Sequence, residues 1–395
     1  MGRFDRVTGY LDGLMEKGIA GGACLVVKGK EEVYRHYEGY ADVAGGREPG
    51  ERTLYRLYSL TKLYTAVAVF TLCEEGKLRL EDAVSDYLPE FAHMEVMRTR
   101  GNGLAEMVEA GTAITLRHLL TMQSGLSYPY DNQGAAVRST RERIESFRSG
   151  NKNYSVMEYA RMLASVPLAF EPGTHFLYGT GYDVLAAVVE AASGMRFGEY
   201  LDQAVLGPMG LRDTMFKINE VDDWNRLAGI YSWNESDGKF RLLKEKDKQY
   251  RPQFSFEEGG GGLVATLDDC MRFLLMLQNG GVSETGVRIL PERYIELMAE
   301  DQLDTVEKLE DYRHQFGGES DYGYGYGVRV KKKNCEPGEF DSPAGEFGWY
   351  GMSGNYVLID RVNQLTLVYM QQMIPGREKE IHGELRKLIY QAIFE

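Results

Sequence analysis

The sequence is poor in cysteine, with four among its 395 residues. They stand far apart, and no C-x-x-C pair or nearby histidine gives them the spacing of a zinc site. A fold built on disulfides or on structural zinc is therefore not indicated. We expect free thiols in a reducing compartment at Cys24, Cys73, Cys270 and Cys335.

Long apolar runs are also missing. The longest, such as residues 66–70 and 184–189, fall far short of the ~20 residues that span a bilayer. The N-terminus has Asp5, Asp12 and Glu16 among its apolar residues, so it lacks the uninterrupted apolar core of a signal peptide. The sequence therefore predicts no membrane partner and a cytoplasmic location.

Positive charge is in deficit. Lys and Arg number 45 against 59 Asp and Glu, which gives a net charge of −14. Phosphate backbones and anionic lipids repel such a chain, so nucleic acid is not expected as a partner. With 43% hydrophobic residues and only 11 prolines, the chain can still build a large core. We expect a globular protein.

Strand-like and helical patterns are unevenly distributed along the chain. Short β-like runs occur near both ends, whereas residues 81–210 show mainly helical patterns and loops. This arrangement predicts one α/β domain, formed by residues 1–80 and 260–395, that is interrupted by a mainly helical domain at 81–259. The polar, glycine-containing segment 128–153 is expected to be a loop that shapes the substrate site.

Common catalytic motifs are absent as well. The sequence contains no G-x-S-x-G, H-E-x-x-H or phosphate-binding loop. The pattern S-x-x-K occurs three times, at 59–62, 149–152 and 236–239. The second and third lie among Gly, Asn and Asp, where turns are expected.

Ser59 differs from the other two serines because it begins a long apolar helical pattern. Unpaired backbone N–H groups and the positive end of the helix dipole favour a developing oxyanion there. Lys62 falls on the same face one turn later, where apolar neighbours would favour its neutral form and let it act as a base. The alternative is a helix-capping serine beside an exposed lysine.

Several blocks resemble the serine β-lactamase-like superfamily, and more narrowly the branch of class C β-lactamases, D-stereospecific peptidases and family VIII carboxylesterases. They span nearly the whole chain in the family's order. They are Y-S-L-T-K at 58–62, L-L-T-M-Q-S-G-L at 119–126, F-E-P-G at 170–173 leading to Tyr178, G-G-G-G-L at 259–263 and F-G-W-Y-G at 347–351. The resemblance implies an antiparallel sheet flanked by N- and C-terminal helices, with the active site beside the inserted helical domain.

The resemblance also implies roles for three residues. Ser59 would be the acylated nucleophile, Lys62 its assisting base, and Tyr178 a proton shuttle at the place of the family's Tyr-x-Asn. A literal Tyr-x-Asn at 130–132 is a weaker alternative, because no helix pattern follows it directly. By the same resemblance the backbone N–H groups of Ser59 and Met352 would form the oxyanion hole.

Two departures from the family pattern bear on the substrate. Thr180 replaces the asparagine that could bind an acyl-amide group, and Trp349-Tyr350-Gly351 replaces a motif that normally carries a cation. Thr180, Trp349, Tyr350 and Gly351 are the predicted substrate-binding residues. Without the cation, binding of a β-lactam carboxylate is in doubt, whereas aromatic rings suit uncharged groups. Trp349 could alternatively be a packing residue.

The sequence therefore predicts a serine hydrolase that cleaves small esters and needs no metal or cofactor. A β-lactamase or D-amino-acid peptidase is the alternative within enzymes. A noncatalytic binding module on the same fold is the alternative from another class.

Overall fold

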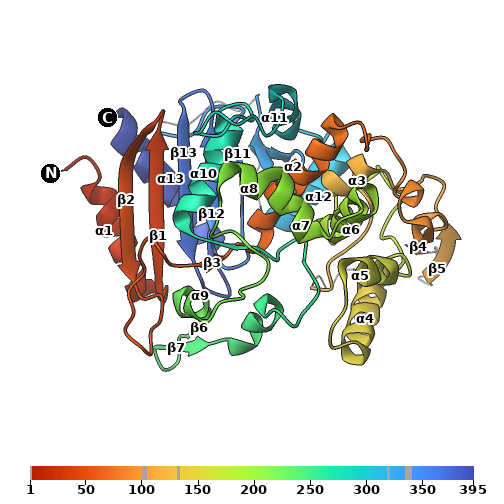
Figure 1. Cartoon of the computed structure of the whole chain (residues 1–395), viewed down its shortest axis with the longest axis horizontal. Helices are drawn as coiled ribbons and strands as arrows, with labels where there is room; N and C mark the ends of the chain where they lie inside the picture. Colours follow the sequence, from red (N-terminus) through yellow and green to blue (C-terminus); the bar gives the residue numbers. More distant parts are fainter. Residues whose placement is uncertain (1, 100–104, 131–133, 318–320, 334–339) are drawn as a thin grey trace.

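A seven-stranded antiparallel sheet joins the two ends of the chain (Figure 1). The computed structural model describes residues 2–99, 105–130, 134–317, 321–333 and 340–395. From one edge to the other, the strands are β2 (Glu31–Gly39), β1 (Gly21–Lys28), β13 (Leu365–Gln371), β12 (Tyr356–Asp360), β11 (Phe347–Tyr350), β10 (Arg329–Lys331) and β9 (Tyr322–Tyr324). The first strand of the chain thus lies beside the last.

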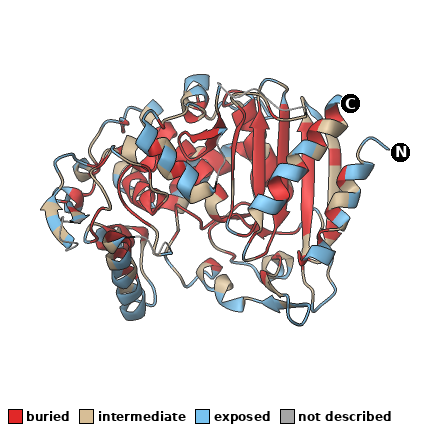
Figure 2. Cartoon of the chain, turned by 180° about the vertical axis from the view of Figure 1, so that it is seen from behind, coloured by how far each residue is buried: buried red, intermediate tan, exposed pale blue. Residues whose placement is uncertain are grey.

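Helices cover both faces of this sheet. Helices α1 (Asp5–Asp12) and α13 (Glu378–Phe394) share an apolar core with one face, and α10 (Leu267–Gln278) packs on the other, in the same core as α2 (Thr61–Glu74). Figure 2 shows the buried strands behind terminal helices whose outer sides are exposed. Because both faces are covered, β1 and β13 are buried along almost their whole length rather than at alternate positions. The predicted architecture of an antiparallel sheet with flanking terminal helices is confirmed.

The middle of the chain is mainly helical, as predicted. Its helices are α3 (Leu116–Leu120), α4 (Ala135–Gly150), α5 (Val156–Leu163), α6 (Gly181–Ser193) and α7 (Phe197–Leu201). Helix α6 is almost wholly buried, because it packs against α2 as well as against its neighbours α3, α5 and α7. Among the described residues, no helix has the length and apolar character that crossing a bilayer requires.

The domain boundaries stay a prediction. Within the segment 81–259, Gly229 donates a hydrogen bond to the carbonyl of Ala41, and Tyr231 donates one to that of Gln372, so this stretch lies against the sheet.

Four further α-helices and three short strand pairs complete the regular structure described so far. The helices are α8 (Gly207–Met209), α9 (Val221–Arg226), α11 (Glu292–Met298) and α12 (Val306–Phe316). The strand pairs are β3 (Tyr55–Arg56) with β8 (Val264–Ala265), β4 (Glu95–Thr99) with β5 (Ala105–Glu109), and β6 (Tyr231–Asn234) with β7 (Lys239–Leu242).

The segment 128–153 is not the loop that the sequence predicts, because most of it forms helix α4. Ala136, Val137, Thr140 and Ile144 are its buried residues, and they recur at helical spacing. A stripe this narrow among many polar residues is easily overlooked. Helix α4 therefore stands on the surface with one thin edge packed inward.

Cys24, Cys73 and Cys270 are free thiols. Cys335 lies outside the described residues. Cys24 in β1 and Cys270 in α10 are buried, which is ordinary for a small apolar side chain.

A carboxyl group lies inside the sheet core. Glu38 in β2 is 5% exposed and pairs in register with Gly22 of β1, where a side chain would collide with its carboxyl oxygen. Burial, with a smaller contribution from Asp12, raises the pKa of Glu38 to about 8 from an ordinary value of 4.5. The folded protein therefore holds a proton that the unfolded chain releases.

We expect this proton to make stability fall as pH rises. Between about pH 5 and pH 8 the folded state binds more protons than the unfolded state, so the unfolding free energy should drop by roughly 1 kcal/mol per pH unit. Urea unfolding across this range measures the slope. Glu38→Gln should flatten it, whereas Glu31→Gln, at an exposed position of the same strand, should not. An unchanged slope in Glu38→Gln would contradict the assignment.

Candidate active site

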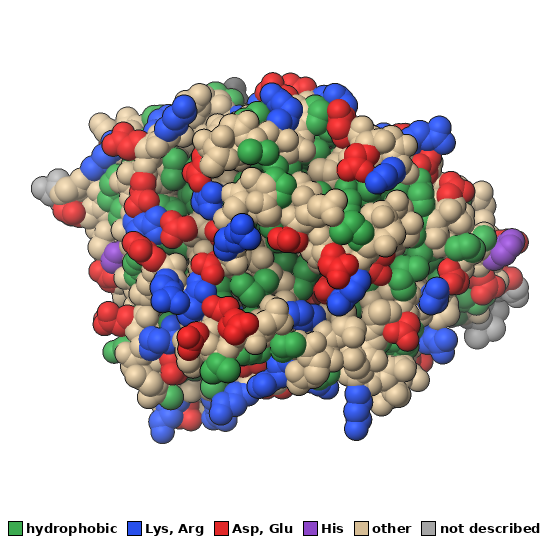
Figure 3. Space-filling model, viewed as in Figure 1, with side chains coloured by type: hydrophobic (Ala, Val, Ile, Leu, Met, Phe, Trp, Pro, Cys, Tyr) green, Lys and Arg blue, Asp and Glu red, His purple; other side chains and the backbone are tan. Residues whose placement is uncertain are grey.

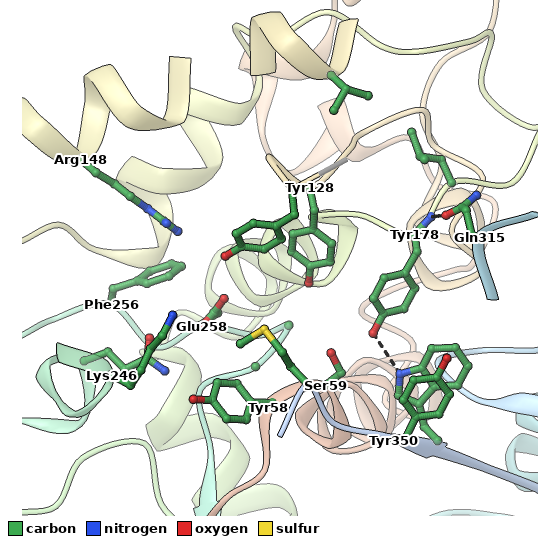
Figure 4. A pocket seen from close by; sticks show the side chains of 18 of the residues that line it. Tyr58, Ser59, Tyr128, Arg148, Tyr178, Lys246, Phe256, Glu258, Gln315 and Tyr350 are labelled. Atoms are coloured by element: carbon green, nitrogen blue, oxygen red, sulfur yellow. Dashed lines mark hydrogen bonds between the residues drawn. The ribbon is translucent and has the colours of Figure 1, made fainter. Parts of the chain in front are cut away.

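Ser59 lies in a tight turn at the start of helix α2 (Figure 4). Residues Tyr58–Leu60 form one 3-10 turn, and Tyr58 has a φ of 46°, a left-handed conformation that is costly for a residue with a side chain. Tyr58 and Leu60 are buried, whereas Ser59 is only half-buried and lines a cavity. The strained turn therefore presents the Ser59 hydroxyl to the cavity.

Lys62 is completely buried, and its amine has three hydrogen-bond partners. Nζ lies 3.1 Å from Ser59 Oγ, 3.1 Å from Tyr128 Oη and 2.7 Å from the Gly260 carbonyl oxygen. It also lies 4.7 Å from the centre of the Tyr178 ring. The structure thus brings together the serine and lysine that the S-x-x-K spacing singles out.

The glycine run at 259–262 passes directly beside this amine. Gly260 donates its N–H to Asp183 Oδ1 at 2.9 Å while its carbonyl accepts from Lys62. A Cβ at Gly260 would lie 2.7 Å from Tyr128 Oη, so only glycine fits there. Burial, together with the nearby Glu258, raises the pKa of Asp183. Asp183 therefore orients the peptide group that holds Lys62, a role that the sequence alone did not reveal.

Tyr128 is a second site residue that the sequence analysis missed. It follows the S-G-L block by two positions, and its hydroxyl reaches Lys62 through the fold rather than through any local spacing. Burial raises its pKa well above the ordinary value, with Asp183 and Tyr178 adding to the effect. The only signal in the sequence was an aromatic residue two positions beyond a recognised block.

Tyr178 is fixed at both its hydroxyl and its backbone. Its hydroxyl accepts a hydrogen bond from Trp349 Nε1 at 2.9 Å. Gln315 in α12 accepts from the Tyr178 N–H at 3.0 Å and donates to the Phe176 carbonyl at 3.1 Å, so one amide holds the segment 176–178 (Figure 4). Asp311, one turn earlier, accepts from the Phe176 N–H at 3.2 Å. Helix α12 therefore positions Tyr178.

The block at 347–351 forms β11 and the turn beyond it. Trp349 and Tyr350 stack with ring centres 4.9 Å apart and both line the cavity, as does Met352. A Cβ at Gly351 would lie 2.6 Å from the Leu57 carbonyl oxygen, so glycine lets this turn approach the Ser59 turn closely. Met352 thus lies near Ser59, and its contribution to an oxyanion hole stays a prediction.

The structure places Thr180 differently from the prediction. Thr180 is 1% exposed, does not line the cavity, and lies at the first turn of α6 with its hydroxyl turned into the core. It cannot touch a ligand in this cavity directly. The alternative tyrosine, Tyr130, lines the cavity and is 69% exposed, while Asp131 and Asn132 of that motif lie outside the described residues.

The cavity has a volume of about 850 Å³. One end is aromatic and includes Phe316, Trp349 and Tyr350; the other carries charged side chains from α4 and from residues 245–258. This size suits a small molecule larger than a short ester. Within the described residues, no three His, Cys, Asp or Glu side chains converge in a way that could hold a metal ion.

The fold and the Ser59–Lys62 pair define an enzyme of the serine β-lactamase-like superfamily. The sequence matches the Beta-lactamase family over residues 7–391, so the chain belongs to this family. Esterase EstB of Burkholderia gladioli is 31% identical over 381 residues, which cover 90% of this chain and 87% of EstB.

Two solved structures have the same fold. Simvastatin synthase (LovD) of Aspergillus terreus superposes with a TM-score of 0.83 at 22% identity, over 100% of this chain and 98% of that one. EstCE1, described as a hydrolase with promiscuous acyltransferase activity, has a TM-score of 0.78 at 23% identity over 98% of both chains.

The clamp formed by Gln315 yields a prediction. Gln315→Leu should slow labelling of Ser59 by a fluorophosphonate about tenfold, because Tyr178 loses its fixed backbone, and should cost about 1 kcal/mol of stability for each hydrogen bond lost. Gln315→Glu keeps the acceptor for the Tyr178 N–H and should retain more reactivity. Glu310→Gln, at an exposed position of α12, is the control. Labelling at the wild-type rate in Gln315→Leu would rule the clamp out.

Proposed function

We propose that the protein is a carboxylesterase that forms an acyl-enzyme on Ser59. The observation that carries this proposal is the 3.1 Å contact between Ser59 Oγ and the buried Lys62 Nζ in a cavity whose third motif offers Trp349 instead of a cation. The 31% identity to an esterase of the same family supports it.

This geometry supports the following first half of the reaction. Lys62 takes the Ser59 proton as Oγ bonds to the ester carbonyl carbon, and the carbonyl oxygen becomes an oxyanion near the N–H groups of Ser59 and Met352. Collapse of this intermediate breaks the bond to the alcohol oxygen, which leaves with a proton. The proton that Lys62 took from Ser59 then replaces the one that Tyr178 gives to the alcohol, after which water attacks the acyl-enzyme with the same proton transfers and releases the acid.

Tyr178 is the proposed donor of the proton to the departing alcohol. The Trp349 N–H and the Lys62 amine over the ring would both stabilise the phenolate that forms when this proton leaves. Tyr128 would keep Lys62 aimed at Ser59. Positioned proton transfer of this kind contributes about 10²- to 10⁴-fold to the rate.

Esters are favoured over β-lactams and D-peptides by the composition of the aromatic end. Trp349 and Tyr350 supply rings where a cation would bind a carboxylate, and Thr180 lies in the core. Amide hydrolysis is the second candidate because the family holds such enzymes. A noncatalytic module is disfavoured, since it has no need of a buried lysine aimed at a cavity serine.

Intact-mass analysis tests the nucleophile. After incubation with a fluorophosphonate, the wild-type protein should gain one adduct, and it should hydrolyse 4-nitrophenyl butyrate without consuming a cephalosporin. Ser59→Ala should lose both adduct and turnover, by at least about 10³-fold. An adduct that persists in Ser59→Ala would refute the nucleophile, and loss of the cephalosporin would favour the amide alternative.

A double-mutant cycle tests the tyrosine. Tyr178→Phe should lower kcat by about 10²-fold and Trp349→Phe by about tenfold. If Trp349 acts through the Tyr178 hydroxyl, the double variant should be no slower than Tyr178→Phe alone. Tyr130→Phe tests the alternative motif and should have a smaller effect than Tyr178→Phe. Additive losses in the cycle would show that Trp349 acts independently.

A further inference from the structure

The end of the cavity remote from Trp349 is charged. In Figure 4, Arg148, Lys246 and Glu258 lie on one side of Ser59, and Tyr350 lies on the other. The segments that carry these three residues, 148–152 and 245–258, contribute four cationic side chains and two carboxylates to the cavity lining: Arg148, Lys152, Lys246, Lys248, Glu245 and Glu258. The excess of positive charge is opposite in sign to the net charge of −14 carried by the whole protein. On the face seen in Figure 3, by contrast, basic and acidic side chains are interspersed.

Arg148 is held in place by aromatic rings. It projects from the last turn of α4, and its guanidinium lies 5.7 Å from the centre of the Tyr159 ring. Tyr159 is 2% exposed and packs against Phe256 and Tyr154, with ring centres 4.8 and 5.7 Å away. A guanidinium that lies over a fixed ring loses less freedom when it binds a ligand than one on a free side chain.

Neither main cation of this end has an ion-pair partner in the part of the chain that the structure describes. No carboxylate there lies within 4.0 Å of Arg148 or of Lys246, Glu258 included. Arg161 of the next helix, by comparison, pairs with Glu90 at 2.9 Å. The two cations thus line the cavity without a carboxylate partner among the described residues, although Glu258 acts on Arg148 electrostatically and Tyr130 and Tyr154 lie beside its guanidinium.

We propose that Arg148 and Lys246 form a subsite for a carboxylate carried by the substrate. The planar guanidinium can bind a carboxylate through two parallel hydrogen bonds, and Lys246 adds a point charge. The Glu258 carboxylate repels an anion that does not contact Arg148 or Lys246. The subsite is therefore restricted to anionic groups that reach these two cations. The ester bond would lie at Ser59, between this subsite and the aromatic end.

This inference rests on the proposed esterase function and narrows its substrates to esters with a remote carboxylate. That carboxylate can belong to the acyl group or to the alcohol, so the test has two arms. The acyl arm compares 4-nitrophenyl hydrogen adipate with its neutral methyl ester. The alcohol arm compares the butyrate ester of 4-hydroxyphenylacetic acid with that of its methyl ester.

Binding is measured first, by calorimetry on Ser59→Ala, which cannot turn the esters over. In the arm that carries the carboxylate on the correct side of the ester, the charged ester should bind about tenfold more tightly than its neutral partner. This difference in affinity should shrink as salt is added. Arg148→Gln, made in the Ser59→Ala background, should abolish the preference, and Arg148→Lys should keep part of it. Arg143→Gln, on the same helix but outside the cavity, should leave it intact.

Hydrolysis by the otherwise wild-type enzyme is then compared within the same pairs. The ratio of kcat/KM for the charged ester to that for the neutral ester should be about ten and should fall to about one in Arg148→Gln. Equal or weaker binding of the charged ester in both arms, or a preference that survives Arg148→Gln combined with Lys246→Gln, would overturn the subsite. Turnover without preference would refute the subsite alone, whereas a binding preference without turnover of any ester would refute the esterase function alone.

Discussion

The burial of the Lys62 amine is the constraint on which the rest of the site depends. An amine with no access to water must have hydrogen-bond partners inside the protein. Ser59 supplies one from the preceding turn of the same chain segment, but the other two come from Tyr128 and Gly260, 66 and 198 positions further along. The helical and sheet-bearing parts of the chain must therefore close on each other before Lys62 can be satisfied.

That closure also explains the small residues near the amine. Gly260 passes between the Tyr128 hydroxyl and the Asp183 carboxyl, and Gly351 passes close to the Leu57 carbonyl, so a side chain at either position would force the segments apart. The cavity that results is bounded by elements from both parts of the chain, which gives it two unlike ends. Aromatic rings from β11 and α12 form one end, and α4 brings a cation to the other.

Much of the fold and part of the site could be predicted from the sequence. The helix that follows Ser59 is apolar on nearly every side, and the strands near both termini are short, mainly apolar runs. Their secondary structure could therefore be predicted from the sequence. Helix α4 was missed because four buried residues among sixteen leave a faint stripe. Thr180 was assigned to the substrate because of its place in a motif, yet its side chain turns into the core at the start of α6.

The sequence by itself determined the pairing of Ser59 with Lys62, because three residues make about one helical turn and local geometry suffices. It also determined that the chain belongs with serine β-lactamase-like proteins, since the blocks recur in order along its length. Only the tertiary structure decided that Tyr128, Gly260, Asp183 and Gln315 take part in the site. Their contacts join segments separated by 66 to 198 positions in the chain. Periodic patterns predict only local structure, so they cannot predict a contact between residues so far apart.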